Sequence, residues 1–153
     1  MVQLGFIPPN NDVHQKINGP DEFRVGPNAT AASMIPGIFV IKDTYDYSVK
    51  QSDGSGNDIG VLAFMGASPN YMPETLNGNY SIGDKCGVWT DTGVRISAWL
   101  TTGQSVVYGQ PLKVVTGGTV SAAGATEREC GTALQTLANS SGSPVRIWIK
   151  KTR

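Results

Sequence analysis

The last third of the chain consists of short apolar segments separated by glycine turns, and this pattern constrains the fold more than any other feature. The segments lie at 109–120 (GQPLKVVTGGTV), 131–134 (GTAL) and 144–150 (PVRIWIK). Valine, isoleucine and threonine favour strands, and glycine pairs favour the tight turns that join strands. No residue with an evident catalytic role lies in these segments, which indicates a protein that acts through its surface.

The same pattern extends upstream and predicts the fold class. Apolar or alternating runs at 37–42, 45–50, 59–65, 83–90 and 94–99 predict further strands, and the run at 45–50 places Tyr45, Tyr47 and Val49 on one face. We expect a hairpin turn at 91–93, an exposed turn at 51–58 and a longer loop at 66–79. Because no segment has the period of an amphipathic helix, the predicted fold is all-β: a small β-barrel or sandwich of short strands with an extended N-terminal arm.

Residues 1–33 differ from the rest of the chain, because prolines, asparagines and glycines interrupt any regular period. An apolar group near the start, Leu4, Phe6 and Ile7, is typical of an extended arm that binds another surface. The alternative is an arm that folds back on its own domain. The predicted organisation is an arm over 1–33 and a β-barrel-like domain over 34–153.

The charge balance argues against nucleic acid as a partner, since the chain has 12 basic and 12 acidic residues and no excess of positive charge to neutralise phosphates. No apolar run is long enough for a transmembrane helix, and the N-terminus lacks the features of a secretory signal. We therefore expect synthesis in a cytoplasm, and no membrane partner. Cys86 and Cys130 have no metal-ligand spacing, so buried free thiols are expected, with a disulfide as the alternative.

Residue types that often carry chemistry occur in poor contexts here. His14 is the single histidine and lies in the predicted arm, near Asp12. The segment 53–58 has oxygen ligands at alternate positions like a calcium loop, but Asp58 occupies the place that needs glycine and Phe64 the place that needs glutamate. The sequence therefore predicts no catalytic residues, no metal and no cofactor, and the protein is not expected to be an enzyme.

Two tryptophans lie on the polar faces of predicted strands. Alternation places Arg146 and Trp148 on one face of 145–150, and it places Trp99 opposite the apolar face of 94–99. Tryptophan and arginine are enriched among residues that dominate binding at protein interfaces. These three residues, with Leu4, Phe6 and Ile7, are the candidate interface residues. The alternative for each tryptophan is burial under loops of its own chain.

An ordered set of motifs over roughly residues 34–150 resembles the capsid decoration, or cement, proteins of tailed phages. The motifs are Pro-Gly at 36–37, Gly-Val-Leu at 60–62, Gly-Asp at 83–84, Gly-Gln-Pro-Leu at 109–112, Gly-Gly-Thr-Val at 117–120, Gly-Thr-Ala-Leu at 131–134 and Pro-Val-Arg-Ile-Trp-Ile at 144–149. The resemblance implies a β-barrel-like head on the outer surface of an icosahedral virion capsid. It also implies trimers, although some such families form dimers, and an N-terminal arm that pairs with the major capsid protein.

The resulting functional prediction is a structural virion protein that stabilises contacts between major capsid protein subunits. Its predicted partners are the major capsid protein and further copies of itself, as a trimer. The alternative is a carbohydrate- or host-surface-binding β module of a phage tail or fibre. In that case Trp99, Trp148 and Tyr71 would be the platforms for sugar rings.

Overall fold

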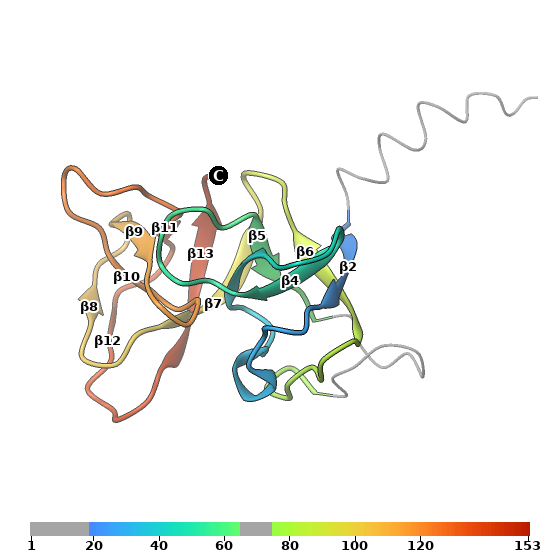
Figure 1. Ribbon diagram of the computed structural model, residues 1–153. Helices are drawn as coiled ribbons and strands as arrows, with labels where there is room; N and C mark the ends of the chain where they lie inside the picture. The colour runs from blue at the N-terminus through green and yellow to red at the C-terminus, as the bar shows by residue number, and fades with distance from the viewer. Residues whose placement is uncertain (1–18, 65–74) are drawn as a thin grey trace, which may run out of the picture.

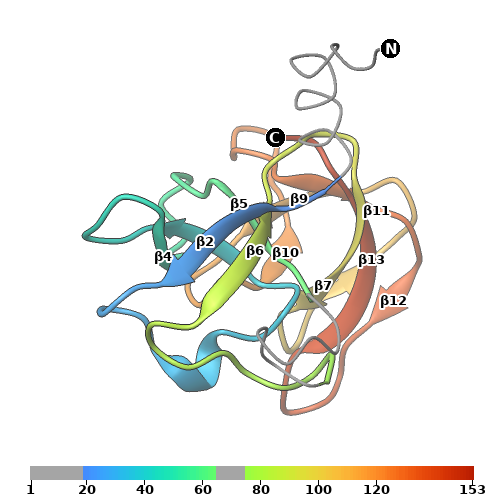
Figure 2. The ribbon, with the colours of Figure 1, turned by 90° about the vertical axis from the view of Figure 1, so that its right-hand side faces the viewer.

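The computed structural model describes residues 19–64 and 75–153 and confirms the all-β fold class. Two small closed barrels of five strands each lie next to one another (Figure 1 and Figure 2). The first barrel is formed by the N-terminal half of the described chain and the second by the C-terminal half. The candidate residues Leu4, Phe6 and Ile7 lie outside the described residues.

The first barrel has the strand order β2-β4-β3-β5-β6. Parallel pairing of β2 with β4 and antiparallel pairing of β2 with β6 close it. Its core includes the fully buried Tyr80, whose hydroxyl donates a hydrogen bond to the carbonyl oxygen of Ala63 at 2.8 Å. The elements are β2 (Asp21–Val25), the short 3-10 helix η1 (Ala31–Ser33), β3 (Phe39–Lys42), β4 (Ser48–Gln51), β5 (Gly60–Leu62) and β6 (Lys85–Trp89).

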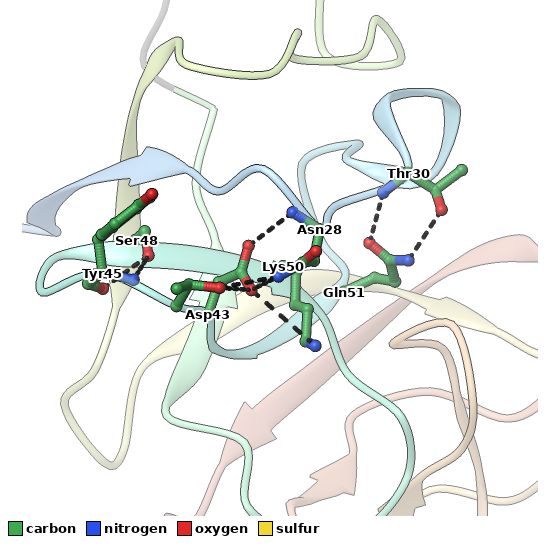
Figure 3. Close-up of polar contacts among 8 residues, drawn as sticks. Asn28, Thr30, Asp43, Tyr45, Ser48, Lys50 and Gln51 are labelled. Carbon is green, nitrogen blue, oxygen red and sulfur yellow. Dashed lines mark hydrogen bonds and ion pairs between the residues drawn. The ribbon is translucent and has the colours of Figure 1, made fainter.

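Strand β2 corrects the predicted boundary of the arm, because residues 21–25 are an integral strand of the first barrel rather than part of an extended segment through residue 33. The segment after β2 is also fixed to the barrel (Figure 3). The Asn28 side chain donates hydrogen bonds to Asp43 Oδ1 at 2.9 Å and to Thr44 Oγ1 at 2.8 Å. Turn-forming residues on both sides of β2 hide this short strand in the sequence.

Asp43 is the buried acceptor in this set of contacts, with a side chain that is 1% exposed. Burial alone would raise the pKa of its carboxyl group. The hydrogen bonds from Asn28, together with the charge of Lys50, outweigh burial and lower the pKa. The carboxylate is therefore ionised near neutral pH and holds the loop after β2 against the β3–β4 turn.

The second barrel has the strand order β10-β7-β13-β11-β9, and β8 and β12 form a separate two-stranded sheet. Its longest pairing joins β7 and β13 in antiparallel register, with Ile96 opposite Ile149. The strands are β7 (Arg95–Leu100), β8 (Ser105–Val106), β9 (Pro111–Val114), β10 (Val120–Ala122), β11 (Gly131–Ala133), β12 (Leu137–Ala138) and β13 (Val145–Lys151).

Alternation along β13 agrees with the prediction from sequence. Ile147 and Ile149 are buried in the core, while Trp148 is exposed on the other face. The same alternation places Lys151 on the core face of β13, where it is fully buried. Its ammonium group donates hydrogen bonds to the carbonyl oxygens of Thr90 at 3.0 Å and Asp91 at 3.2 Å. Burial lowers the pKa of Lys151.

Two local predictions are wrong. The turn at 91–93 does not join a hairpin, because β6 pairs with β2 and β5 in the first barrel while β7 pairs with β10 and β13 in the second. The segment instead crosses from one barrel to the other. The predicted strand at 45–50 begins only at Ser48, because Tyr45 and Tyr47 lie in the β3–β4 turn and are exposed.

The two barrels share a packed seam. Phe39 and Val61 of the first barrel belong to the core of the second. The Phe39 N–H donates to the carbonyl oxygen of Gly118 at 2.8 Å, and the Gly117 N–H donates to that of Ser52 at 2.8 Å. Gly118 has φ of 84°, and a side chain there would collide with the Phe39 carbonyl oxygen. Glycine is therefore required at this close approach of the two backbones.

Candidate interaction surface between the two barrels

Arg146 on β13 joins the two barrels across this seam. Its guanidinium lies 4.0 Å from the centre of the Trp99 ring, the residue opposite it on β7. Nη1 donates to the carbonyl oxygens of Pro36 at 2.6 Å and Ser97 at 3.2 Å, and Nη2 donates to that of Leu76 at 2.6 Å. Arginine suits this position because its planar group stacks on a ring while its N–H groups point outward in a fixed fork.

The remaining donors of Arg146 reach Asn77, whose Oδ1 atom lies 3.0 Å from Nη2 and 3.3 Å from Nε. All five acceptor contacts are thus to neutral oxygens. Burial lowers the pKa of Arg146, but a guanidinium stays protonated in proteins. The group therefore acts as a fixed cation that holds residues 36, 76 and 77 against β13.

Trp99 lies within the seam rather than on an open surface. Its indole Nε1 donates to the Pro36 carbonyl oxygen at 3.0 Å, and its ring packs against the core of the first barrel. Trp99 is therefore partly covered by its own chain, which agrees in part with the alternative stated for each tryptophan. Trp148 differs, because 55% of its surface is exposed.

An open groove of about 490 Å³ runs beside Arg146 along the seam. Phe64 and Leu76 line one part of it, 41% and 45% exposed, and Trp148 lines another. Arg95 adds an exposed cation. The groove therefore combines three exposed large apolar side chains from both barrels with positive charge, which is a composition typical of protein interfaces.

The structure brings together three of the six interface residues that the sequence singled out: Trp99 and Arg146 stack, and Arg146 and Trp148 line the groove. Phe64 and Leu76 were not predicted. Phe64 follows a strand that is buried on both faces, so alternation does not reveal that it points outward. Leu76 lies in the predicted 66–79 loop, where no strand alternation assigns a direction to a side chain.

Other reactive groups in the described chain are buried or dispersed. Cys86 and Cys130 are free and buried, as predicted, and burial raises the pKa of each thiol to about 12. Neither thiol is a nucleophile at neutral pH. Within residues 19–64 and 75–153, no group of three or more His, Cys, Asp or Glu is placed to hold a metal ion, and no helix is long and apolar enough to cross a membrane. His14 lies outside these ranges.

No protein-family model matches the chain, and no curated protein matches it in sequence. Among solved structures, the chain is similar to the crystal structure of the N base of head fiber gp8.5 in bacteriophage phi29. The TM-score is 0.46 and the sequence identity 14%, over 87% of this chain and 94% of that chain. A likeness at this level carries no argument about function, which therefore has to be inferred from the chain's own residues.

Proposed function

We propose that this protein is a non-enzymatic structural virion protein that binds the outer surface of a mature icosahedral capsid and stabilises contacts between major capsid protein subunits. The observation that carries the proposal is the groove at the seam, where Phe64, Leu76 and Trp148 expose large apolar surfaces side by side around one open groove. The order of motifs over 34–150, which resembles that of tailed-phage decoration proteins, gives the kind of partner.

The proposed mechanism is stabilisation by mass action. A protein that binds the assembled lattice but not its dissociated subunits stabilises the lattice by its free energy of binding. Assembly as a homotrimer would let one particle contact several capsid subunits, so that weak individual contacts combine into high avidity. Residues 1–18 would add a further contact, with Leu4, Phe6 and Ile7 filling apolar pockets on the capsid.

The rigid placement of the groove favours this mechanism. Arg146 fixes residues 36, 76 and 77 against β13, so the backbone that carries Leu76 is held at the groove before a partner binds. Less conformational entropy is then lost on binding, and the affinity rises. Of the three residues expected to carry sugar rings in the alternative function, Trp99 is partly buried and uses its indole N–H on the Pro36 carbonyl oxygen. Tyr71 lies outside the described residues.

The test is co-sedimentation with expanded capsids of the virus that encodes the chain. A Trp148→Ala variant is expected to bind roughly 30-fold more weakly, since loss of a central interface tryptophan typically costs about 2 kcal/mol or more. Tyr108→Ala is the matched control, because Tyr108 is also exposed, at 70%, but lies away from the groove. Equal binding by the Trp148 variant and wild type would contradict the assignment of the groove.

Light scattering tests the oligomer. A mass of three times the 16.2 kDa protomer, or a monomer that binds capsids to saturation, is expected. A monomer without affinity for capsids would contradict the proposal as a whole.

A further inference from the structure

The β3–β4 turn of the first barrel exposes two tyrosines. Tyr45 is 65% exposed and Tyr47 is 72% exposed. Tyr47 is the non-glycine residue with positive φ among the described residues, at 58°. Glycine or asparagine would adopt this conformation with less strain, so folding alone does not favour tyrosine here. Strained residues of this kind are concentrated at binding and catalytic sites.

Hydrogen bonds fix the turn in place. The Ser48 hydroxyl donates to the Tyr45 carbonyl oxygen at 2.6 Å, and the Tyr45 N–H donates to Ser48 Oγ at 2.9 Å (Figure 3). From β2, the Arg24 N–H donates to the Tyr47 carbonyl oxygen at 2.7 Å. The backbone that carries both rings is therefore held against two neighbouring strands.

A pocket of about 410 Å³ lies beside Tyr47. The rings of Tyr47 and Phe23 form its apolar part, with centroids 6.2 Å apart and planes inclined at 54°. The other lining residues are all charged: Glu22, Arg24, Asp46 and Lys85. This volume falls within the usual range for small-molecule sites, roughly 300–1,000 Å³.

Two of the charged groups are oriented by partners outside the pocket. The Arg24 guanidinium donates a hydrogen bond to the Gly83 carbonyl oxygen at 3.0 Å. The Asp46 carboxylate forms an ion pair with the Lys42 ammonium group at 3.1 Å. Lys85 lies opposite Arg24 in the β2–β6 register. The pocket thus places two carboxylates and two cations around a pair of aromatic rings.

We infer that this pocket binds a neutral oligosaccharide. A pyranose ring presents C–H groups on its faces, which pack on aromatic rings, and hydroxyl groups on its edges, which both donate and accept hydrogen bonds. The tilted Phe23–Tyr47 pair supplies the first kind of contact, and the mixed charged groups supply donors and acceptors for the second. The two carboxylates and the two cations of the pocket balance in charge. Neither an anionic nor a cationic ligand therefore gains a net electrostatic attraction from the site.

The pocket and the seam groove have no lining residue in common. Binding of a saccharide at the β3–β4 turn therefore leaves Phe64, Leu76 and Trp148 available to a protein partner. A protein attached to a capsid by the groove would still have a second site for surface glycans.

The test uses the full chain on an array of neutral and acidic oligosaccharides, followed by NMR titration with N-acetylchitotriose, maltotriose and each neutral hit. Saturable binding of a neutral glycan is expected, with amide shifts concentrated at residues 22–24, 45–47 and 85. Tyr47→Gly removes the ring and also relieves the backbone strain, so the fold should be retained while affinity falls at least 10-fold. Asp46→Asn, at an exposed carboxylate, should also weaken binding, whereas Tyr108→Ala should not.

Three results would overturn the inference: no saturable binding of any neutral glycan, shifts that map elsewhere on the protein, or full affinity in Tyr47→Gly. If Tyr47→Gly instead loses capsid binding while wild type ignores glycans, the turn belongs to the capsid-binding surface and the saccharide site is refuted. Capsid binding by Trp148→Ala is measured separately, so failure of the saccharide site and failure of the proposed function are distinguishable.

Discussion

Arg146 and Trp148 are two residues apart on the same face of β13, yet they have different roles. Arg146 uses its donors on neutral oxygens of its own chain, whereas the Trp148 side chain remains 55% exposed. Arg146 is therefore mainly a structural residue that positions the groove. Trp148 is the residue of this pair with surface left for a partner.

Replacing Arg146 by alanine is expected to lower the free energy of unfolding by about 2–4 kcal/mol, measured by urea denaturation. The variant removes the donor to the carbonyl oxygen of Leu76, leaves Trp99 as the donor to that of Pro36, and removes the stacking on Trp99. Arg146→Lys should recover only part of this loss, since an ammonium group lacks the planar fork.

The control for Arg146 is Arg95→Ala, because Arg95 is an exposed arginine on the adjacent strand β7. Its substitution should change stability by less than about 0.5 kcal/mol. If the two alanine variants were equally stable, Arg146 would not hold the seam together.

At the residue scale, alternation along a strand predicts which face of the sheet a side chain lies on, but not which residues surround it. The period of two along 145–150 correctly separates Ile147 and Ile149 from Trp148. It does not reveal that residues 36, 76 and 77, distant in sequence, converge on Arg146. Interface and structural arginines carry the same local pattern, so only the fold distinguishes them.

At the scale of elements, the turn between β9 and β10 offers a matched pair of glycines. Both Gly117 and Gly118 have positive φ, at 92° and 84°. A side chain at 117 would meet open space, whereas one at 118 would collide with the Phe39 carbonyl oxygen in the first barrel. Gly117→Ala should therefore cost about 1–2 kcal/mol from backbone strain alone, and Gly118→Ala should cost more, about 3 kcal/mol or above.

Thermal and urea unfolding of the two alanine variants would measure this difference directly. Equal destabilisation would mean that the backbone approach between Gly118 and Phe39 does not contribute to the stability of the seam. A larger loss at 117 would contradict the observed packing of the turn.

Strand positions were largely predictable, because β3, β7, β9 and β13 are apolar or alternating runs bounded by glycine or proline. Which strands pair with one another was less predictable than where the strands lie. The turn at 91–93 has the composition of a hairpin, but a barrel closes through contacts between strands far apart in sequence, such as β2 with β6. Local composition does not encode which strands pair. For this reason the sequence predicted one barrel or sandwich, whereas the structure has two barrels.

At the scale of the whole molecule, the two barrels depend on each other. Phe39 and Val61 of the first barrel fill part of the second core, and Arg153 near the C-terminus pairs with the buried Asp58 at 2.9 Å. Breaking either barrel exposes apolar surface of the other. We therefore expect the two barrels to unfold as one cooperative unit.

Two truncations separate the predicted arm from the barrels. Deletion of residues 1–18 removes Leu4, Phe6 and Ile7 but leaves β2 and its pairing with β4 and β6 intact. The shortened protein should keep its far-UV circular dichroism and its melting temperature, and should bind capsids more weakly. Deletion of residues 1–33 also removes β2, which opens the first barrel and removes Val25 from its core.

The longer truncation should therefore melt at a much lower temperature or fail to fold, because an opened barrel exposes strand edges and its apolar core. Its loss of capsid binding would then say nothing about the arm, whereas loss in the folded 1–18 deletion would. A 1–33 deletion with unchanged stability would mean that β2 is dispensable. A 1–18 deletion that decorates capsids to full occupancy at the wild-type affinity would restrict the capsid contact to the barrels and their groove.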